Sequence, residues 1–436
     1  MNSQHLTSQS RNPKLGKRLR NLAQKSNRTP PVAPARWIRE EEIMGISIRT
    51  VFLSALGLAL LPLAALAQNV VKIGQIEAQT GPAAIYGWMG AMGVRLAVNE
   101  INAAGGFTVA GKQYKFELIQ PDTQGNPQQG LLHAKKLLEQ DQVKYLLGPS
   151  LTNVFRGVQE YVKDYNGKIL WFAPATAAYL ELGKPGFDQM LLRPVLWDTA
   201  PLGFGTTLID LLKKKGVKKV AFLLQNDSGA QVLLDIYREP MKKAGIELQE
   251  HLFEPNTKDY SAVLSRIAAW KPDYLAPGYT DGVLFDIVQQ ATQLGLTKFW
   301  LVRGTLGPGL RNKDQLDEYI AYVPKYFEEA IKTEPKAAKF MDDWKRFFKT
   351  SDFPWDQAAQ CYAACYDMPF MLVEAFKRAG SVDDVQKVRR EMQNMVYKGL
   401  FTQSFDEKGS GIHSYSIVEL RRGGKTIVHN VEPPAK

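Results

Sequence analysis

A short apolar segment, followed by a turn and then a helix, is the part of the sequence best suited to bind a small anion. Within residues 144–155, Gly148 and Pro149 end a Tyr-Leu-Leu run typical of a buried strand, and Thr152 and Asn153 are suitable N-cap residues for the next helix. The first N–H groups of a helix lack intrahelical acceptors and lie at its positive end, so this turn could hold a carboxylate. The alternative interpretation is an ordinary capping turn.

Sequence patterns typical of catalysis or metal binding are absent. The chain has no Gly-x-Ser-x-Gly elbow, no Gly-x-Gly-x-x-Gly and no phosphate loop. Its histidines, among them His133, His251 and His413, are scattered, and Cys361 and Cys365 lie four apart in a helical stretch where a disulfide is disfavoured. We expect buried free thiols, no metal, no cofactor, and a binding protein rather than an enzyme.

The basic residues of the chain are concentrated near its start. The chain has 436 residues, of which 45% are hydrophobic and 23% are charged. This length and composition allow two domains, each with its own hydrophobic core. The net charge of +11 is misleading, because residues 1–67 hold ten Lys or Arg against three Glu and the remainder carries only +4. So mild a charge gives no support to nucleic-acid binding.

The leader contains a secretory signal. An apolar run of 17 residues ends in Ala-Leu-Ala directly before Gln68, where we expect cleavage. We assign the signal peptide to residues 44–67, expect translation to start at Met44, and expect the mature protein in the periplasm. An uncleaved membrane anchor is the alternative for the apolar run, and a DNA-binding arm is the alternative for residues 1–43.

Strands and helices alternate along the mature chain in two series. The predicted strands cover residues 70–76, 115–120, 145–147 and 169–172 in the first series, and 219–224, 246–253, 274–277 and 298–302 in the second. After about residue 324 the chain is mostly helical, with strands again at 414–420 and 426–430. Such alternation predicts α/β lobes with parallel sheets, helices on both faces, and a ligand at the carboxyl ends of the strands.

Seven short segments carry a family resemblance. They are 70–74 (Val-Val-Lys-Ile-Gly), 80–82 (Thr-Gly-Pro), 97–106 (Ala-Val-Asn-Glu-Ile-Asn-Ala-Ala-Gly-Gly), 145–150 (Tyr-Leu-Leu-Gly-Pro-Ser), 173–176 (Ala-Pro-Ala-Thr), 258–261 (Lys-Asp-Tyr-Ser) and 364–367 (Ala-Cys-Tyr-Asp). In this order, after a signal peptide, the set resembles the leucine/isoleucine/valine-binding proteins of ABC transporters. The resemblance implies a type I periplasmic binding protein: two Rossmann-like lobes, a three-crossover hinge, and a ligand cleft that closes by hinge motion.

The resemblance also implies the division of the chain and its partners. Residues 1–67 are the leader, residues 68–195 plus about 325–400 form ligand-binding lobe 1, and residues 196–324 plus about 401–436 form ligand-binding lobe 2. The expected partners are a small-molecule ligand and an ABC-transporter permease in the membrane, and we expect a monomer that binds no nucleic acid.

The family's ligand contacts can be carried over residue by residue. The ligand carboxylate is held after the third and fourth strands of lobe 1, and further contacts come from the first strand, from lobe 2 and from a late helix. In this sequence the matching residues are Tyr86, Trp88, Thr152, Asn153, Ala175, Thr176, Ser228, Tyr279, Arg303 and Gln357. Each of them could instead be an ordinary core or rim residue.

One departure from the family concerns the ligand class. Amino-acid binders carry an acid at the end of a lobe 2 strand, where it pairs with the ligand's ammonium, but here the alignment puts Arg303 at that position. A cation there disfavours an α-amino acid, because unpaired like charges in a closed cleft are costly. We therefore expect an aromatic or dicarboxylic organic acid. The alternatives are a branched-chain amino acid, an amide or urea-like solute, an exported enzyme, or a ligand-sensing regulator subunit.

Overall fold

The structure is a computed structural model. It describes residues 69–81, 84–194, 203–278, 281–301, 315–323, 327–348 and 355–432, and for some residues within helices it describes the backbone alone. The predicted signal peptide, Tyr279 and Arg303 lie outside the described residues.

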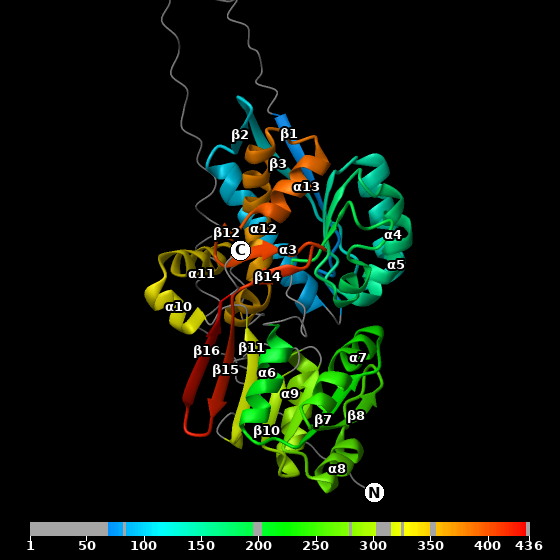
Figure 1. The fold of residues 1–436 in the computed structure, drawn as a ribbon, viewed down its shortest axis with the longest axis vertical. Coiled ribbons are helices and arrows are strands. Elements are labelled where there is room, and N and C mark those ends of the chain that lie inside the picture. Colours follow the sequence, from blue (N-terminus) through cyan, green and yellow to red (C-terminus); the bar gives the residue numbers. More distant parts are fainter. Residues whose placement is uncertain are drawn as a thin grey trace, which may run out of the picture. The chain divides into compact units, whose positions relative to one another are not determined.

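The first sheet has six strands, all within residues 69–192 (Figure 1). Its strands pair in parallel except for β2, which pairs antiparallel with β3 as a hairpin that the sequence pattern did not predict. In spatial order the strands are β2 (Phe107–Val109), β3 (Lys112–Ile119), β1 (Asn69–Gln75), β4 (Tyr145–Leu147), β5 (Leu170–Phe172) and β6 (Leu191–Leu192).

Helices cover both faces of this sheet. One core joins the strands to α3 (Ala84–Ala103), α12 (Trp355–Ala379) and α13 (Val385–Asn394). The other joins them to α4 (Pro127–Lys135), its π-helical continuation η1 (Lys136–Gln140), α5 (Thr152–Val162) and the 3₁₀ segment η3 (Thr176–Glu181). The short 3₁₀ segment η2 (Lys163–Tyr165) continues α5.

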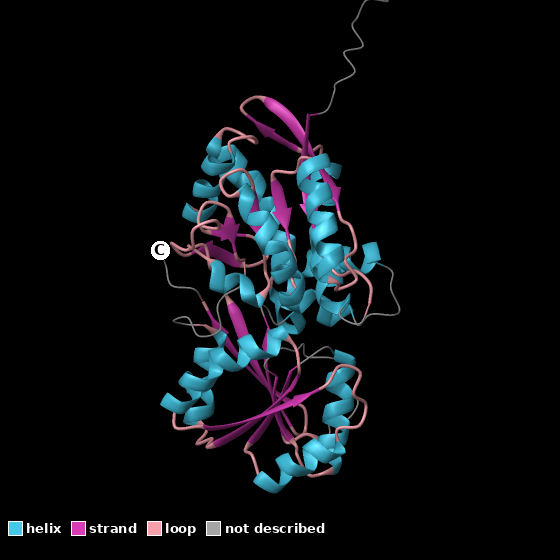
Figure 2. Cartoon of the chain, turned by 90° about the vertical axis from the view of Figure 1, so that its right-hand side faces the viewer, coloured by secondary structure: helices cyan, strands magenta, loops and turns pink. Residues whose placement is uncertain are grey.

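The second sheet has seven strands, and Figure 2 shows them in magenta between helices. In spatial order the strands are β16 (Lys425–Val431), β15 (Tyr415–Arg421), β11 (Glu318–Val323), β10 (Lys298–Leu301), β9 (Tyr274–Gly278), β7 (Lys219–Gln225) and β8 (Glu247–Phe253). Strands β7 to β11 pair in parallel, whereas β15 pairs antiparallel with β11 and β16 pairs antiparallel with β15. Strand β11 was not predicted from the sequence.

The second sheet is also covered on both faces. Helices α6 (Phe204–Lys214) and α7 (Ser228–Lys243) pack in one core, and α8 (Ser261–Trp270) and α9 (Asp281–Gln293) pack in the other. Two further helices are α10 (Phe327–Thr333) and α11 (Pro335–Phe348). Among the described helices, none is both long and apolar enough to cross a membrane.

A small third sheet lies between α13 and β15 in the sequence. It consists of β12 (Tyr397–Lys398), β13 (Thr402–Phe405) and β14 (Gly411–His413), none of which the pattern predicted. Phe405 packs in the same core as β1 and α12, and Leu400 and Phe401 pack with α3 and α11. These strands therefore contribute to the cores of the first sheet's helices.

Candidate functional site

The candidate site lies where three neighbouring parallel strands of the first sheet end. Strands β1, β4 and β5 are adjacent and parallel, so the loops after them meet at one edge of the sheet. Ligands of open α/β sheets bind at this edge, outside the carboxyl ends of the strands.

The turn between β4 and α5 is held by backbone and side-chain contacts. Gly148 has a φ of +77°, and a Cβ there would lie 2.2 Å from the carbonyl oxygen of Ile76, so only glycine fits. The Gly148 N–H donates to Phe172 at 2.8 Å, and the Gly148 carbonyl accepts the Trp171 indole N–H at 2.6 Å. The carbonyl of Pro149 accepts the N–H of Ala175 at 3.2 Å. These bonds tie the two loops after β4 and β5 together.

The helix after this turn begins without a side-chain cap. The prediction that Thr152 and Asn153 are N-cap residues is wrong, because they are the first two residues of α5 and the N-cap position belongs to Leu151. Thr152 is buried, whereas Asn153 is exposed and donates through Nδ2 to the carbonyl of Gly125 at 2.9 Å. The first hydrogen bond of the helix is from Phe155 to Leu151, so the preceding N–H groups of α5 have no intrahelical acceptor.

Helix α7, which follows strand β7 of the second sheet, begins with a side-chain cap. Asp227 is the N-cap of α7, and its carboxylate accepts the N–H groups of Gly229 and Ala230, both at 2.8 Å. An acid of the chain already occupies this helix end. Helix α5, by contrast, begins with no side chain of the described residues bonded to its first N–H groups, so this positive helix end is not capped by an acid of the described chain.

A buried carboxyl group holds the turn between β4 and α5 through hydrogen bonds. Glu77, two residues after β1, is 1% exposed, and its two oxygens accept the backbone N–H of Ser150 at 3.0 Å and the Ser150 hydroxyl at 2.8 Å. Burial raises the pKa of Glu77 to about 8, against the lowering effect of the bonds from Ser150. Neither residue was among the predicted contacts. The available signal was an acid directly after an apolar strand pattern.

The loop after β5 contains two of the predicted contacts. Ala175 is fully buried, and its carbonyl accepts the Nε–H of the buried Arg193 at 3.2 Å. Thr176 begins η3, and its side chain is outside the described set. The structure thus brings the backbone of Ala175 and Thr176 close to the α5 turn through the Pro149 contact.

Trp88 is partly buried and packs against a core cluster that includes residues of α3 and α11. Its ring packs edge to face with Trp344, with centroids 6.2 Å apart, beside a cluster that includes Phe340. Its ligand contact stays a prediction. So do the contacts of the remaining predicted residues, whose side chains are not described: Tyr86 in α3, Ser228 in α7, Gln357 in α12, and Tyr279 and Arg303 in the gaps.

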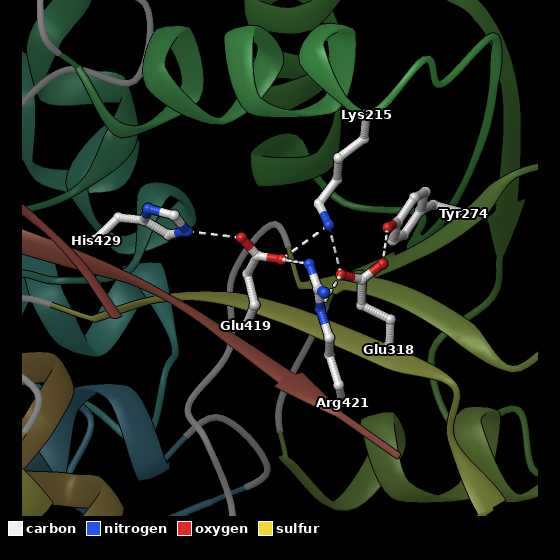
Figure 3. A network of polar contacts seen from close by, with 6 residues as sticks. All are labelled: Lys215, Tyr274, Glu318, Glu419, Arg421 and His429. Carbon is white, nitrogen blue, oxygen red and sulfur yellow. Dashed lines mark hydrogen bonds and ion pairs between the residues drawn. The ribbon is translucent and has the colours of Figure 1, made fainter. Parts of the chain in front are cut away.

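A network of polar side chains lies at one edge of the second sheet, where the parallel strands begin (Figure 3). Lys215 bonds to Glu318 at 2.6 Å and to Glu419 at 2.8 Å, and Arg421 contacts the same two carboxylates. Each acid of the network is matched by cations, and the network lies at the sheet edge where the parallel strands begin rather than where they end. We therefore interpret it as structural.

Thiol and imidazole groups form no reactive cluster among the described residues. Cys365 is a buried free cysteine whose pKa is raised by burial and by nearby Glu77, which keeps the thiol protonated. No group of three or more His, Cys, Asp or Glu in the described ranges has the arrangement of a metal site.

Comparison with known proteins gives the family. A family model described as periplasmic binding protein matches residues 70–425. A Leu/Ile/Val-binding protein of Rhizobium johnstonii is 31% identical over 57% of this chain and 69% of its own length.

Solved structures share the fold. A leucine-binding protein of Thermotoga maritima has a TM-score of 0.68 at 21% identity, covering 84% of this chain and 99% of its own. A solute-binding protein of an R. palustris ABC transporter, solved in complex with benzoate, has a TM-score of 0.67 at 15% identity, covering 84% and 98%. The predicted two-lobed α/β fold is confirmed. The chain belongs to the periplasmic binding protein family, the solute-binding receptors of ABC transporters, and is a relative of the leucine/isoleucine/valine-binding proteins.

Proposed function

We propose that this chain is an exported receptor that binds a small organic carboxylate at the N-terminus of α5 and delivers it to a permease. The observation that carries the proposal is the contrast between two helix ends: α5 has no side-chain cap, whereas Asp227 occupies the end of α7. Free helix N–H groups and a positive dipole end favour an anion.

The proposed contacts for the carboxylate are Thr152, Asn153, Ala175 and Thr176. The hydrogen bonds that join Pro149 to Ala175 and Gly148 to Phe172 support this grouping, because they hold the two loops in a fixed relation. A preorganised turn loses little freedom on binding, which favours affinity. Tyr86, Trp88, Ser228, Tyr279, Arg303 and Gln357 are proposed to surround the rest of the ligand.

An organic acid is preferred over an α-amino acid because of Arg303. In the resemblance this residue replaces the acid that pairs with a ligand ammonium, and its planar guanidinium suits a second carboxylate or an aromatic ring. The benzoate bound by the structural neighbour belongs to this ligand class. The second candidate is a branched-chain amino acid, which the name of the Rhizobium relative favours.

The proposed lobes follow the two sheets. Lobe 1 takes residues 68–195 and about 325–400, and lobe 2 takes the rest of the mature chain. The packing of Phe405 with β1 and α12 supports extending lobe 1 to about residue 413. In this proposal the lobes close over the ligand by hinge motion, and the closed form of the monomeric, periplasmic receptor is recognised by the permease.

A thermal-shift screen of mature protein tests the proposal. Benzoate, succinate, leucine, isoleucine, valine and urea are each added in excess, and a ligand should raise the melting temperature because it stabilises the folded state by RT ln(1 + [L]/Kd). We expect a shift with at least one of the two acids. A shift with the three amino acids alone would reject the organic-acid assignment, and no shift with any compound would reject the proposed ligand class altogether.

A pair of threonine variants tests the location. Hydrogen bonds to a charged group contribute about 1.5 to 3 kcal/mol, so Thr152→Val should weaken binding of the acid by about tenfold to a hundredfold. The control is Thr108→Val on β2, where an exposed Thr108 hydroxyl bonds only within its own hairpin, to Gln113. Equal affinity in both variants would remove the α5 turn from the site.

A further inference from the structure

We propose that Glu77 takes up a proton when an organic anion binds at the N-terminus of α5, so that this residue both positions the ligand turn and makes affinity depend on pH. The inference rests on the proposed function, because it requires an anion at that helix end. Glu77 is a positioning residue in this account, since it holds the turn through Ser150.

The carboxyl group of Glu77 is bonded to the turn that directly precedes the proposed anion site. Both Glu77 oxygens are bonded to the same residue, Ser150, at 3.0 Å and 2.8 Å. Ser150 lies two residues before Thr152, so the two Cα atoms are within about 8 Å of each other. An anion held by the first N–H groups of α5 is therefore close to Glu77, with the turn between them.

The surroundings of Glu77 give its negative charge no compensation. A Cβ built at Gly90 of α3 would lie 3.5 Å from a Glu77 oxygen, 3.6 Å from the Ser150 hydroxyl and 3.7 Å from the Cys365 sulfur, so α3 and α12 enclose the group. Among the residues that the structure describes, no cation forms an ion pair with Glu77. A second negative charge nearby would make ionised Glu77 still less favourable.

Three other titratable groups of the surrounding elements either bond to other partners or stay protonated. Asp122, which bridges to Glu77 through the backbone, directs its carboxylate to Thr80 and to backbone N–H groups. Arg95 on α3 is hydrogen-bonded to Gln120 and Gln79. Cys365 on α12 is kept protonated by burial and by Glu77 itself. Glu77 is thus the group whose protonation state should respond to a bound anion.

The linkage has a definite direction. The pKa of Glu77 in the free protein is about 8, and a bound anion raises it further because it disfavours the carboxylate. Below that pH the group is already protonated and binding takes up no proton. Above it, binding draws one proton from solvent, and the affinity should fall by up to tenfold for each pH unit.

Calorimetry of benzoate binding between pH 6.5 and 9.5 tests the inference, with succinate as the probe if benzoate does not bind. At each pH, titrations in two amine buffers that both buffer at that pH but differ in ionisation enthalpy give the number of protons taken up, from the difference in observed heat. Wild-type protein should bind with no uptake near pH 6.5 and with up to one proton near pH 9. Glu77→Gln, which keeps the size of the side chain and can still bond to Ser150, should bind the acid without proton uptake at any pH.

The matched control is Glu117→Gln, on the exposed side of β3, which should retain the wild-type pH profile. Binding by wild-type protein without proton uptake at pH 9 would overturn the inference and leave the proposed function intact. Uptake that persists in Glu77→Gln would assign it to another group and also overturn the inference. Absence of binding by both acids would reject the proposed function, and this inference with it.

Discussion

The hydroxyl of Tyr145, in the strand that leads to the turn at Gly148 and Pro149, donates to the carbonyl of Val382 at 2.7 Å, 237 residues further along the chain. Both residues are buried, and Val382 lies in the loop between α12 and α13. The bond joins strand β4 to the segment between α12 and α13, so the last third of the chain supports the part of the sheet that precedes the turn at Gly148 and Pro149.

Tyr145→Phe should lower the free energy of unfolding by about 1 to 3 kcal/mol, because it leaves the buried carbonyl of Val382 without its donor. Urea denaturation followed by circular dichroism measures this change. The control Tyr114→Phe removes a hydroxyl from a less buried ring stacked on Phe107 and should change stability by less than about 0.5 kcal/mol. Equal effects of the two variants would contradict the structural role of the Tyr145 bond.

Buried Glu77 should make the free protein less stable as pH rises from about 4.5 to 8. Its folded-state pKa, about 8, is above the unfolded value of 4.5, so in this window the folded state binds more protons and stability falls with pH. The slope contributed by one proton is at most about 1.4 kcal/mol per pH unit. Urea denaturation at pH 5, 6.5 and 8 should show this slope in wild-type protein and its loss in Glu77→Gln. Parallel pH profiles would show that Glu77 is ionised in the folded state.

The network in Figure 3 should have the opposite pH dependence. Burial favours neutral Glu419, but hydrogen bonds from Lys215, His429 and Arg421 outweigh it and lower the pKa to about 2. A depressed carboxyl pKa contributes stability that is present above about pH 4.5 and is lost as the pH falls towards 2.

Glu419→Gln should therefore destabilise the protein at pH 7 by about 1.5 to 3 kcal/mol, because the half-buried Lys215 and the exposed Arg421 lose a charged hydrogen-bond partner. Its control is Asp383→Asn, which breaks the exposed pair with Lys144 and should cost less than about 1 kcal/mol. Thermal melts at pH 7 compare the two variants, and at pH 2.5 the difference between wild type and Glu419→Gln should shrink. A difference that does not depend on pH would rule out the charge network as its cause.

Arg303→Ala should lower the affinity for an organic acid by about 2 kcal/mol or more, which is roughly thirtyfold, because the ligand loses a charged partner. Isothermal calorimetry measures the affinity, and Arg422→Ala, which removes an exposed partner of Asp317, is the matched control. Unchanged affinity in Arg303→Ala would remove this residue from the site.

Local sequence signals predicted the alternating elements well and the long-range ones poorly. The Tyr-Leu-Leu run of β4 and the apolar positions Val154, Val158 and Val162 of α5 carry their own periodicity, and both elements formed as expected. By contrast, β13 and β14 are short and mixed in polarity, and they are stabilised by residues far away: Asp367 on α12 accepts the N–H groups of Leu400 and Phe401, and the amide of Gln403. No local pattern contains that information.

In the candidate site, too, local features were predictable from the sequence and long-range contacts were not. The turn at Gly148 and Pro149 was identified from the sequence, because glycine and proline end a strand pattern recognisably. The supporting contact between Glu77 and Ser150 was not, since the two residues are 73 apart and meet only when β1 and β4 pair. The assignment of Thr152 and Asn153 as caps failed because the helix starts one residue earlier than side-chain preference suggests.

The most direct test of the account is calorimetric titration of a protein comprising residues 68–436 with benzoate, succinate, leucine, isoleucine and valine at pH 7. The account predicts saturable binding of at least one of the two acids and no measurable heat of binding for the three amino acids. Tight binding of leucine, isoleucine or valine would contradict it and make this chain an ordinary amino-acid receptor.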